Sequence, residues 1–415
     1  LRVCVHFWRF IMANTLLTID QITRMSLVIL HQKCNFIGNI TRSYDDSFAK
    51  EGAKIGSTLR IRLPNEYTVS DGPTLSVQDQ DELSVTLSVD IQKHVDMAFT
   101  SADMALSVQD FTERFVDPSM SVLAAALESN ALSMTEEIYQ TVDNLGTSIS
   151  MRQITDVRTL LVNALCPMTD NWSAVMRPQD NGDLVNANKG LFQAASEISS
   201  QYRKGRIGVT GGFTFYENTL LPTHASGTTS ATNSILITTS LTVSATTPTT
   251  ALATTNSTVG GGTFVAGDVF TLSNINRCHP ETKQDTGELQ QMVVTTNVGA
   301  TSVQAITFTP PLYLTGARQN VIPAAATAAS LEKVGVPSDI YKSSIFFHPG
   351  AFTFATADLI KPSGLDMVGR SVKDGISMRI LRDYDPTYDR VITRCDVLAG
   401  KQTLRAQLAA RVLSM

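Results

Sequence analysis

The sequence predicts an α+β protein with a β-rich insertion, and three observations support this fold class. Two segments, 59–63 and 83–92, alternate between apolar and polar residues, which is typical of half-buried strands. A helical stripe with apolar residues three and four positions apart follows Asp117. A Thr-rich stretch, 218–267, contains no charged side chain. Together these patterns predict helices and strands in one elaborated fold.

Composition limits the classes of function. A chain of 415 residues with 43% hydrophobic and 17% charged residues is expected to fold into two or three domains, or one elaborated domain, around a substantial core. The net charge of -5 argues against a dedicated nucleic-acid binder, which needs a basic field to release counterions from phosphates. No apolar run reaches the ~18 residues that span a bilayer.

The cysteines do not indicate a disulfide framework or a zinc site, because their number is odd and no Cys-x-x-Cys occurs. We expect buried free thiols instead. The five positions are Cys4, Cys34, Cys166, Cys278 and Cys395.

The first residues, 1–11, are predicted to be an upstream or non-native extension, with Met12 as the natural start. They read LRVCVHFWRFI and lack the small-residue cleavage site of a secretory signal. A genuine apolar arm that packs on a neighbour is the alternative.

The N-terminal elements are a helix over 16–30, a Gly-punctuated arm and two strands. In the first strand Leu59, Ile61 and Leu63 face one way, and Arg60 and Arg62 face the other. The second strand covers 83–92, after a polar segment whose turn is Asp-Gly-Pro at 71–73. Because an isolated two-stranded ribbon is marginal in water, this hairpin is expected to lie on a partner.

A long helix is predicted from Asp117, with Pro118 at its first position, to a stop at Gly146. Its length would be ~43 Å. Glu128, Glu136 and Glu137 are expected to lie off its apolar stripe. The next segment is predicted to hold helices near 156–165 and 189–202, with a strand at 172–176 between them.

Between Thr223 and Thr263, 21 of 41 residues are Ser or Thr. This composition fits either a disordered linker or a β-rich module with Thr-bearing strands. We favour a small barrel-like domain with 245–262 as its loosest loop. The chain then returns to the main fold with a strand at 345–347, a short helix begun by Pro349, and a hairpin around DYDPTYD.

No segment predicts catalysis, a cofactor or a metal. The Gly-rich stretches at 208–212 and 260–262 lack the features of a phosphate-binding loop. The six histidines occur in uninformative contexts, although a Ser-His-Asp triad is recognised by geometry and not by sequence. Cys278-His279-Pro280-Glu281 is interpreted as a surface turn, and so are the carboxylates at 383, 385 and 389.

The block 31–69, HQKCNFIGNITRSYDDSFAKEGAKIGSTLRIRLPNEYTV, together with the order of elements, resembles the coat-protein family of the short-tailed Salmonella phages (the P-22 type). The phrases GRIGVTGGFTFYENTLLPTH and TRCDVLAGKQTLRAQLAARV are similar to that family as well. The resemblance implies the Hong Kong 97-type viral capsid fold, with an N-terminal arm, an extended E-loop, a peripheral P-domain with its spine helix, an axial A-domain and an inserted β domain.

On this reading the domain boundaries are as follows. Residues 1–11 are the extension, 12–50 the N-terminal arm and helix, 51–104 the E-loop hairpin, 105–153 the P-domain with spine helix, 154–222 the first part of the A-domain, 223–333 the inserted domain, and 334–415 the C-terminal strands of the A- and P-domains.

The resemblance implies a major capsid protein that self-assembles, as hexamers and pentamers, into an icosahedral shell around double-stranded DNA. The implied partners are other copies of the chain, a scaffolding protein, a portal protein and, as an open question, a decoration protein, with only loose contact to packaged DNA and none to membrane. The implied location is the virion capsid, assembled in the host bacterial cytoplasm.

Candidate subunit-interface residues lie in and beside the E-loop hairpin, where acids of one copy would meet arginines of another. They are Arg60, Arg62, Glu66, Asp79, Asp81 and Glu82. A solvated loop is the alternative for the acids. Two other functions stay open: an encapsulin-like compartment shell that holds enzymes, and a Thr-rich surface adhesin or secreted hydrolase.

Overall fold

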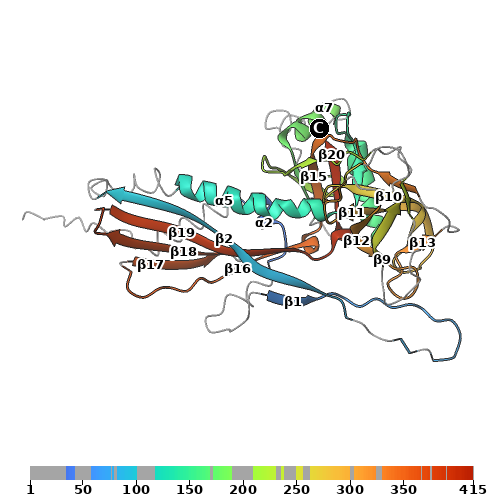
Figure 1. The fold of residues 1–415 in the computed structure, drawn as a ribbon, viewed down its shortest axis with the longest axis horizontal. Coiled ribbons are helices and arrows are strands. Elements are labelled where there is room, and N and C mark those ends of the chain that lie inside the picture. Colours follow the sequence, from blue (N-terminus) through green and yellow to red (C-terminus); the bar gives the residue numbers. More distant parts are fainter. Residues whose placement is uncertain are drawn as a thin grey trace, which may run out of the picture.

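The computed structural model describes residues 34–42, 58–75, 77–78, 82–100, 117–168, 172–188, 209–229, 235–237, 249–255, 262–299, 303–323, 330–365, 367–373, 376–388 and 390–414. These residues form a long sheet, a central sheet and a β-barrel (Figure 1). The predicted mixture of helices and strands, with a β-rich insertion, is confirmed.

The long sheet has the strand order β1-β2-β19-β18-β17, with β16 also paired to β19. The strands are β1 (Thr58–Arg62), β2 (Ser84–Thr100), β16 (Phe352–Ala357), β17 (Met367–Lys373), β18 (Ile376–Asp385) and β19 (Arg390–Thr403). Helix α5 (Asp117–Leu132) lies along this sheet (Figure 1). Along β19, Cys395 and Val397 are buried in the core. Asp396, the residue between them, forms an ion pair of 2.6 Å with Arg379 of β18.

The central sheet has the order β3-β20-β15-β4-β6-β5, and β7 pairs with β15. Its strands are β3 (Thr141–Asp143), β4 (Trp172–Met176), β5 (Val209–Thr210), β6 (Phe213–Glu217), β7 (Thr223–Ala225), β15 (Ile340–Phe347) and β20 (Ala409–Ser414). Helices α6 (Met151–Asn163) and α7 (Pro178–Asn188) accompany it, and short 3-10 turns occur at η4 (Pro349–Ala351) and η5 (Ala406–Leu408). Phe213 and Phe346 stack edge to face at 5.1 Å in its core.

The inserted barrel is closed, because its strand order β11-β12-β9-β8-β14-β10 returns to β11 through the pairing of β10 with β11. All of these pairings are antiparallel, and β13 adds to β10. The strands are β8 (Ile235–Ile237), β9 (Thr249–Thr255), β10 (Val269–Cys278), β11 (Asp285–Val294), β12 (Val303–Leu312), β13 (Val321–Pro323) and β14 (Ser330–Lys333). The barrel has a hydrophobic core separate from that of the two sheets. Closure leaves few open strand edges, which suits a small inserted module.

Two expectations about element boundaries are wrong. Helix α5 ends at Leu132 and continues only as a 3-10 turn, η3 (Ser133–Glu137), so the helix does not reach Gly146. The chain leaves the helix because β3 pairs in parallel with β20. The predicted loose loop at 245–262 contains strand β9, which pairs with both β8 and β12.

Other elements follow the sequence closely. The strand at Trp172–Met176 and the hairpin of β18 and β19 are confirmed, and the helix expected near 156–165 is α6, at Met151–Asn163. The 3-10 turn η4 begins at Pro349, where the short helix was expected. The helices expected over 16–30 and 189–202 lie outside the described residues.

Candidate subunit interface

Strand β1 places two arginines on the exposed side of the long sheet, as its alternation predicts. Ile61 is buried against Leu87 and Ala355. The intervening Arg60 and Arg62 are exposed. Arg60 Nε donates a hydrogen bond to Ser84 Oγ at 2.6 Å, across the pairing of β1 with β2. The two guanidinium groups therefore lie at the sheet edge from which the loop between these strands departs.

We call residues 63–83 the extended loop. It leaves the long sheet and passes below the barrel in the view of Figure 1. At its base, Leu63 N–H donates to Leu83 O at 2.9 Å, and Arg62 forms an ion pair of 3.2 Å with Glu82 of the same chain. The side chains of Arg62 and Glu82 are 75% and 52% exposed.

The structure brings some predicted interface residues together and separates others. Arg60, Arg62 and Glu82 meet at the base of the extended loop. Glu66 instead lines a hollow beside the barrel. Asp79 and Asp81 lie outside the described residues. Contact of these side chains with a second copy stays a prediction.

Sequence reasoning missed the apolar side chains of the extended loop. Tyr67, Val69, Leu75 and Val77 are 56%, 92%, 86% and 81% exposed. Their signal was present in the segments NEYTV and TLSV, which interrupt an otherwise polar loop. Exposed apolar side chains that gather in one place are typical of interaction surfaces.

A second missed feature is a buried ionic cluster, which joins the barrel to the central sheet. Asp268 is fully buried and accepts hydrogen bonds from the N–H groups of Gly227 at 3.0 Å and Val265 at 2.9 Å. His224 Nε2 lies 2.9 Å from its Oδ1, and Lys333 Nζ lies 3.2 Å from its Oδ2. Burial opposes ionisation, but the His224 hydrogen bond and the Lys333 charge hold the pKa of Asp268 below its ordinary value.

The cluster extends to the C-terminal strand. The buried Arg411 of β20 donates to Gly267 O at 2.6 Å and to Thr141 Oγ1 at 3.1 Å. His224 Nδ1 faces Glu136 at 4.0 Å. These contacts fix the barrel against the central sheet by directional bonds that a purely apolar joint would not provide. Asp268 is the first charged residue after the uncharged stretch, which is the signal the sequence offered.

Glu128 of α5 is also buried, which corrects the expectation that it lies off the apolar stripe. Its carboxylate accepts hydrogen bonds from the N–H groups of Phe36 and of Ile37, the latter at 3.2 Å, and from Asn218 Nδ2 at 3.1 Å. The first two belong to the short helix α2 (Asn35–Gly38). Burial raises the pKa of Glu128 to about 7, although these hydrogen bonds oppose the shift. Glu128 therefore holds the described N-terminal segment against α5.

The remaining candidate motifs lie only partly in turns: Cys278 is buried at the end of β10, Asp383 lies within β18, and Asp389 lies outside the described residues. His279 Nδ1 accepts the N–H groups of Glu281 at 3.3 Å and Thr282 at 3.2 Å, and the Asp385 carboxylate accepts that of Thr387 at 3.0 Å. Across the described part of the chain, no three His, Cys, Asp or Glu side chains gather as metal ligands. Within the same part, no helix is long and apolar enough to span a membrane.

The sequence matches the model of the P22 coat protein family (P22 coat protein, gene protein 5) over residues 43–411. The chain belongs to this family. It is therefore a phage major capsid protein, and copies of it assemble into the shell of the virion. No curated protein matches the sequence.

This coat protein is similar to several solved phage capsids. The Mycobacterium phage Che8 protein is 12% identical, with a TM-score of 0.45 over 90% of this chain and 88% of that chain. The mature capsid protein of bacteriophage PhiM1 is 11% identical, with a TM-score of 0.45 over 92% and 89%. The capsid protein of Helicobacter pylori bacteriophage KHP30 is 9% identical, with a TM-score of 0.40 over 92% and 91%.

Proposed function

We propose that the extended loop is the element with which each copy of this coat protein contacts its neighbour in the shell. The observation that carries the proposal is the exposure of Tyr67, Val69, Leu75 and Val77 on a loop that has no core of its own. Burying one such side chain contributes about 1.5–3 kcal/mol. A closed shell repeats the contact at every subunit, so a modest contact suffices.

The charged residues at the base of the loop supply the polar rim of this contact. The pair of Arg62 with Glu82 is solvent-exposed, and such pairs contribute only about 0–1 kcal/mol. Exchanging it for a pair with a neighbouring copy therefore costs little. The proposed interface residues are Arg60, Arg62, Glu66, Asp79, Asp81 and Glu82.

Charge reversal tests the rim. The double variant Arg60→Glu with Arg62→Glu is expected to lose most of its shell yield, measured by sedimentation and electron microscopy, while the unassembled protein keeps its urea midpoint. Arg152→Glu is the control, because this side chain on α6 is 83% exposed and lies outside the loop. An unchanged shell yield in the double variant would refute the assignment.

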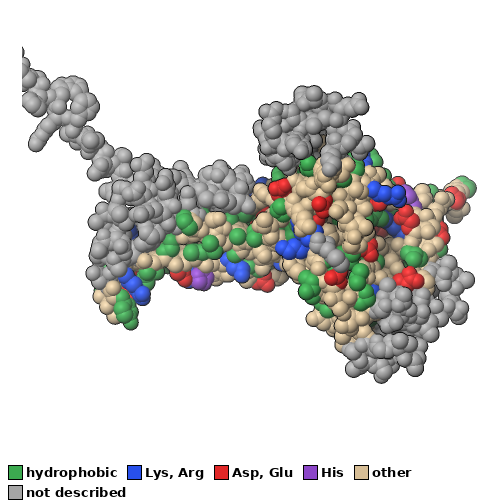
Figure 2. All heavy atoms as spheres, turned by 90° about the horizontal axis from the view of Figure 1, so that it is seen from above, with side chains coloured by type: hydrophobic (Ala, Val, Ile, Leu, Met, Phe, Trp, Pro, Cys, Tyr) green, Lys and Arg blue, Asp and Glu red, His purple; other side chains and the backbone are tan. Residues whose placement is uncertain are grey.

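The proposal extends to the other components of a phage head. A scaffolding protein inside the growing shell sets its curvature, a portal ring occupies one vertex, and double-stranded DNA fills the interior with loose contact to the wall. Assembly takes place in the host bacterial cytoplasm, and a decoration protein on the outer surface is a further candidate. The net charge of -5 supports a wall that encloses DNA without gripping it, and the face in Figure 2 mixes acidic with basic side chains.

Co-expression tests these partners. The coat protein with its phage's scaffolding protein is expected to yield closed shells of one size, whereas the coat protein alone should give irregular ones. Equal size distributions would contradict a scaffolding requirement. The family match favours this phage shell over a compartment that holds enzymes.

A further inference from the structure

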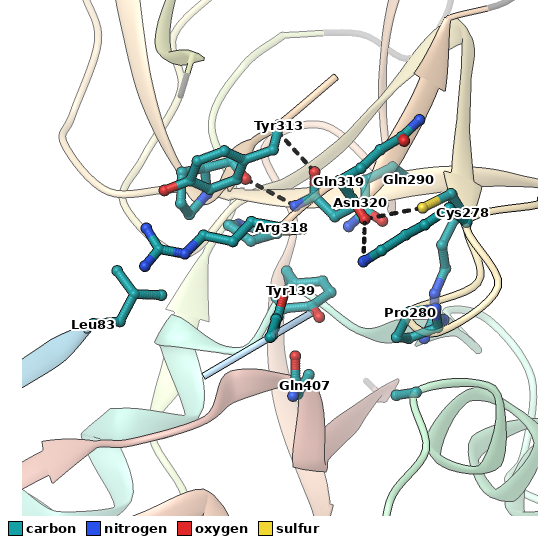
Figure 3. A pocket seen from close by; sticks show the side chains of 16 residues that line it. Leu83, Tyr139, Cys278, Pro280, Gln290, Tyr313, Arg318, Gln319, Asn320 and Gln407 are labelled. Carbon is teal, nitrogen blue, oxygen red and sulfur yellow. Dashed lines mark hydrogen bonds between the residues drawn. The ribbon is translucent and has the colours of Figure 1, made fainter. Parts of the chain in front are cut away.

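A hollow of about 160 Å³ lies where the barrel, the central sheet and the extended loop meet (Figure 3). Three cationic side chains from different parts of the barrel line it. Arg277 lies near the end of β10, Lys283 in the turn between β10 and β11, and Arg318 in the loop between β12 and β13. Glu66 of the extended loop and Tyr139, which lies just before β3 of the central sheet, line the other sides.

The barrel holds the side chain of Lys283 in place. Lys283 Nζ donates to Gln319 O at 3.2 Å, and the thiol of Cys278 donates to the same oxygen at 3.0 Å. Burial raises the pKa of that thiol; the charges of Lys283 and Arg277 oppose the rise, and those of Glu66 and Asp285 add to it. Arg318 extends toward Leu83 in Figure 3.

The positive charge of the hollow is only partly balanced. Arg318 already has an interaction partner, so the balance depends on Arg277 and Lys283, and Glu66 is the one carboxylate among the described lining residues. No hydrogen bond or ion pair joins the Arg277 guanidinium to another residue of the described chain, although Arg277 also lines a second hollow of about 200 Å³ to which Glu288 contributes a carboxylate. A guanidinium presents a planar fork of donors that fits a carboxylate or phosphate. The walls therefore offer charge and donors for one more anionic group.

We propose that this hollow binds a single oxyanion group, and that in the shell an acidic side chain of a second copy of the chain supplies it. The occupant follows from charge and position. Each neighbouring copy carries 38 acidic against 33 basic residues. The hollow borders the base of the extended loop, so this part of the inference rests on the proposed function of that loop. A DNA duplex carries a charge every ~1.7 Å along its axis and calls for a basic stripe rather than one recess.

Oxyanion binding is tested on the unassembled protein with inorganic phosphate, titrated against sodium chloride at constant ionic strength. Wild type is expected to show a saturable rise in its melting temperature. Because a charge-assisted hydrogen bond is worth about 1.5–3 kcal/mol, Arg277→Gln should weaken the apparent affinity about tenfold or more. Arg152→Gln is the control and should bind as wild type. The absence of a phosphate-specific rise, or an equal rise in Arg277→Gln, would overturn the site; Lys283→Gln repeats the test if Arg277→Gln does not fold.

The identity of the occupant is tested by assembly. Arg277→Gln is expected to lower shell yield, whereas Arg60→Glu with Arg62→Glu should lower shell yield and leave phosphate binding intact. Phosphate binding therefore distinguishes the two proposals: it tests the oxyanion site in the hollow and does not depend on whether the extended loop contacts a neighbouring copy. Weakened phosphate binding with normal shells, or displacement of phosphate by a short DNA duplex, would overturn the second copy as the occupant.

Discussion

The Nε2 atom of His224 lies 2.9 Å from Oδ1 of Asp268, although 44 residues separate them in the chain. Both side chains are buried in the joint between the central sheet and the barrel, where Lys333 supplies the balancing charge. The ionic cluster therefore fixes the barrel to the central sheet.

Replacing Asp268 by Asn tests this joint. The substitution preserves the shape but leaves the buried Lys333 ammonium without its carboxylate, and breaking a buried pair in this way costs about 3–5 kcal/mol. We expect a correspondingly lower urea midpoint for the barrel and faster hydrogen exchange at the Val265 and Gly227 amides. Glu288→Gln, an exposed site on β11, should leave both readouts unchanged. Wild-type exchange in Asp268→Asn would show that the ionic cluster does not hold the joint.

Glu128 predicts a specific pH dependence. Its pKa is raised from 4.5 to about 7, mainly by burial. The folded state therefore binds its proton more tightly than the unfolded state does, so this contribution to stability is fully present below the unfolded pKa and is lost as pH rises through about 7. The shift corresponds to about 3 kcal/mol.

Urea unfolding of wild type and Glu128→Gln between pH 4 and pH 8 measures this contribution. The difference in unfolding free energy should change in favour of the Gln variant as pH rises, because Gln cannot ionise. Glu288→Gln, an exposed carboxyl on β11, is the comparison. Parallel pH profiles for wild type and Glu128→Gln would contradict the assignment.

Local patterns predicted the strands of the long sheet because their alternation is a property of neighbouring residues. Ile61 and Leu87 are buried as that alternation requires, and β1 pairs with β2 in register from Thr58 to Arg62. The length of α5 was overestimated because the chain after Glu137 forms β3, which pairs with the distant strand β20. Apolar spacing cannot report such a pairing.

The buried ionic cluster could not be predicted for a related reason. His224, Asp268, Lys333 and Arg411 come from four separate segments, and each looks alone like an ordinary surface residue. Only closure of the barrel beside the central sheet brings them together. By contrast, the arginines of β1 were placed correctly because the alternation of one strand decides their direction.

The apolar residues of the extended loop should matter for assembly and not for folding. Val69→Asp with Leu75→Asp places two charges where 92% and 86% of each side chain is exposed, so the unassembled protein should unfold as wild type does. Shell yield should fall strongly, because burying these charges in a neighbour is costly. Ile360→Asp, an 82% exposed site outside the loop, is the control. An equal loss of shells in the control would contradict the proposal that the extended loop forms the contact between copies.

Gly400 in β19 is required by close packing of two backbones. A Cβ at this position would lie 2.2 Å from Ser88 O and 2.9 Å from the carbonyl carbon of the same residue in β2, where the strand register shifts. Since backbone cannot move aside as a flexible side chain can, Gly400→Ala should destabilise the long sheet by about 1–3 kcal/mol. Gly182→Ala, in α7 with no atom within 4 Å of its added Cβ, should instead stabilise by about 0.5–1 kcal/mol. Thermal unfolding of both variants measures the contrast, and a Gly400→Ala protein as stable as wild type would mean that the β2–β19 pairing relaxes without cost.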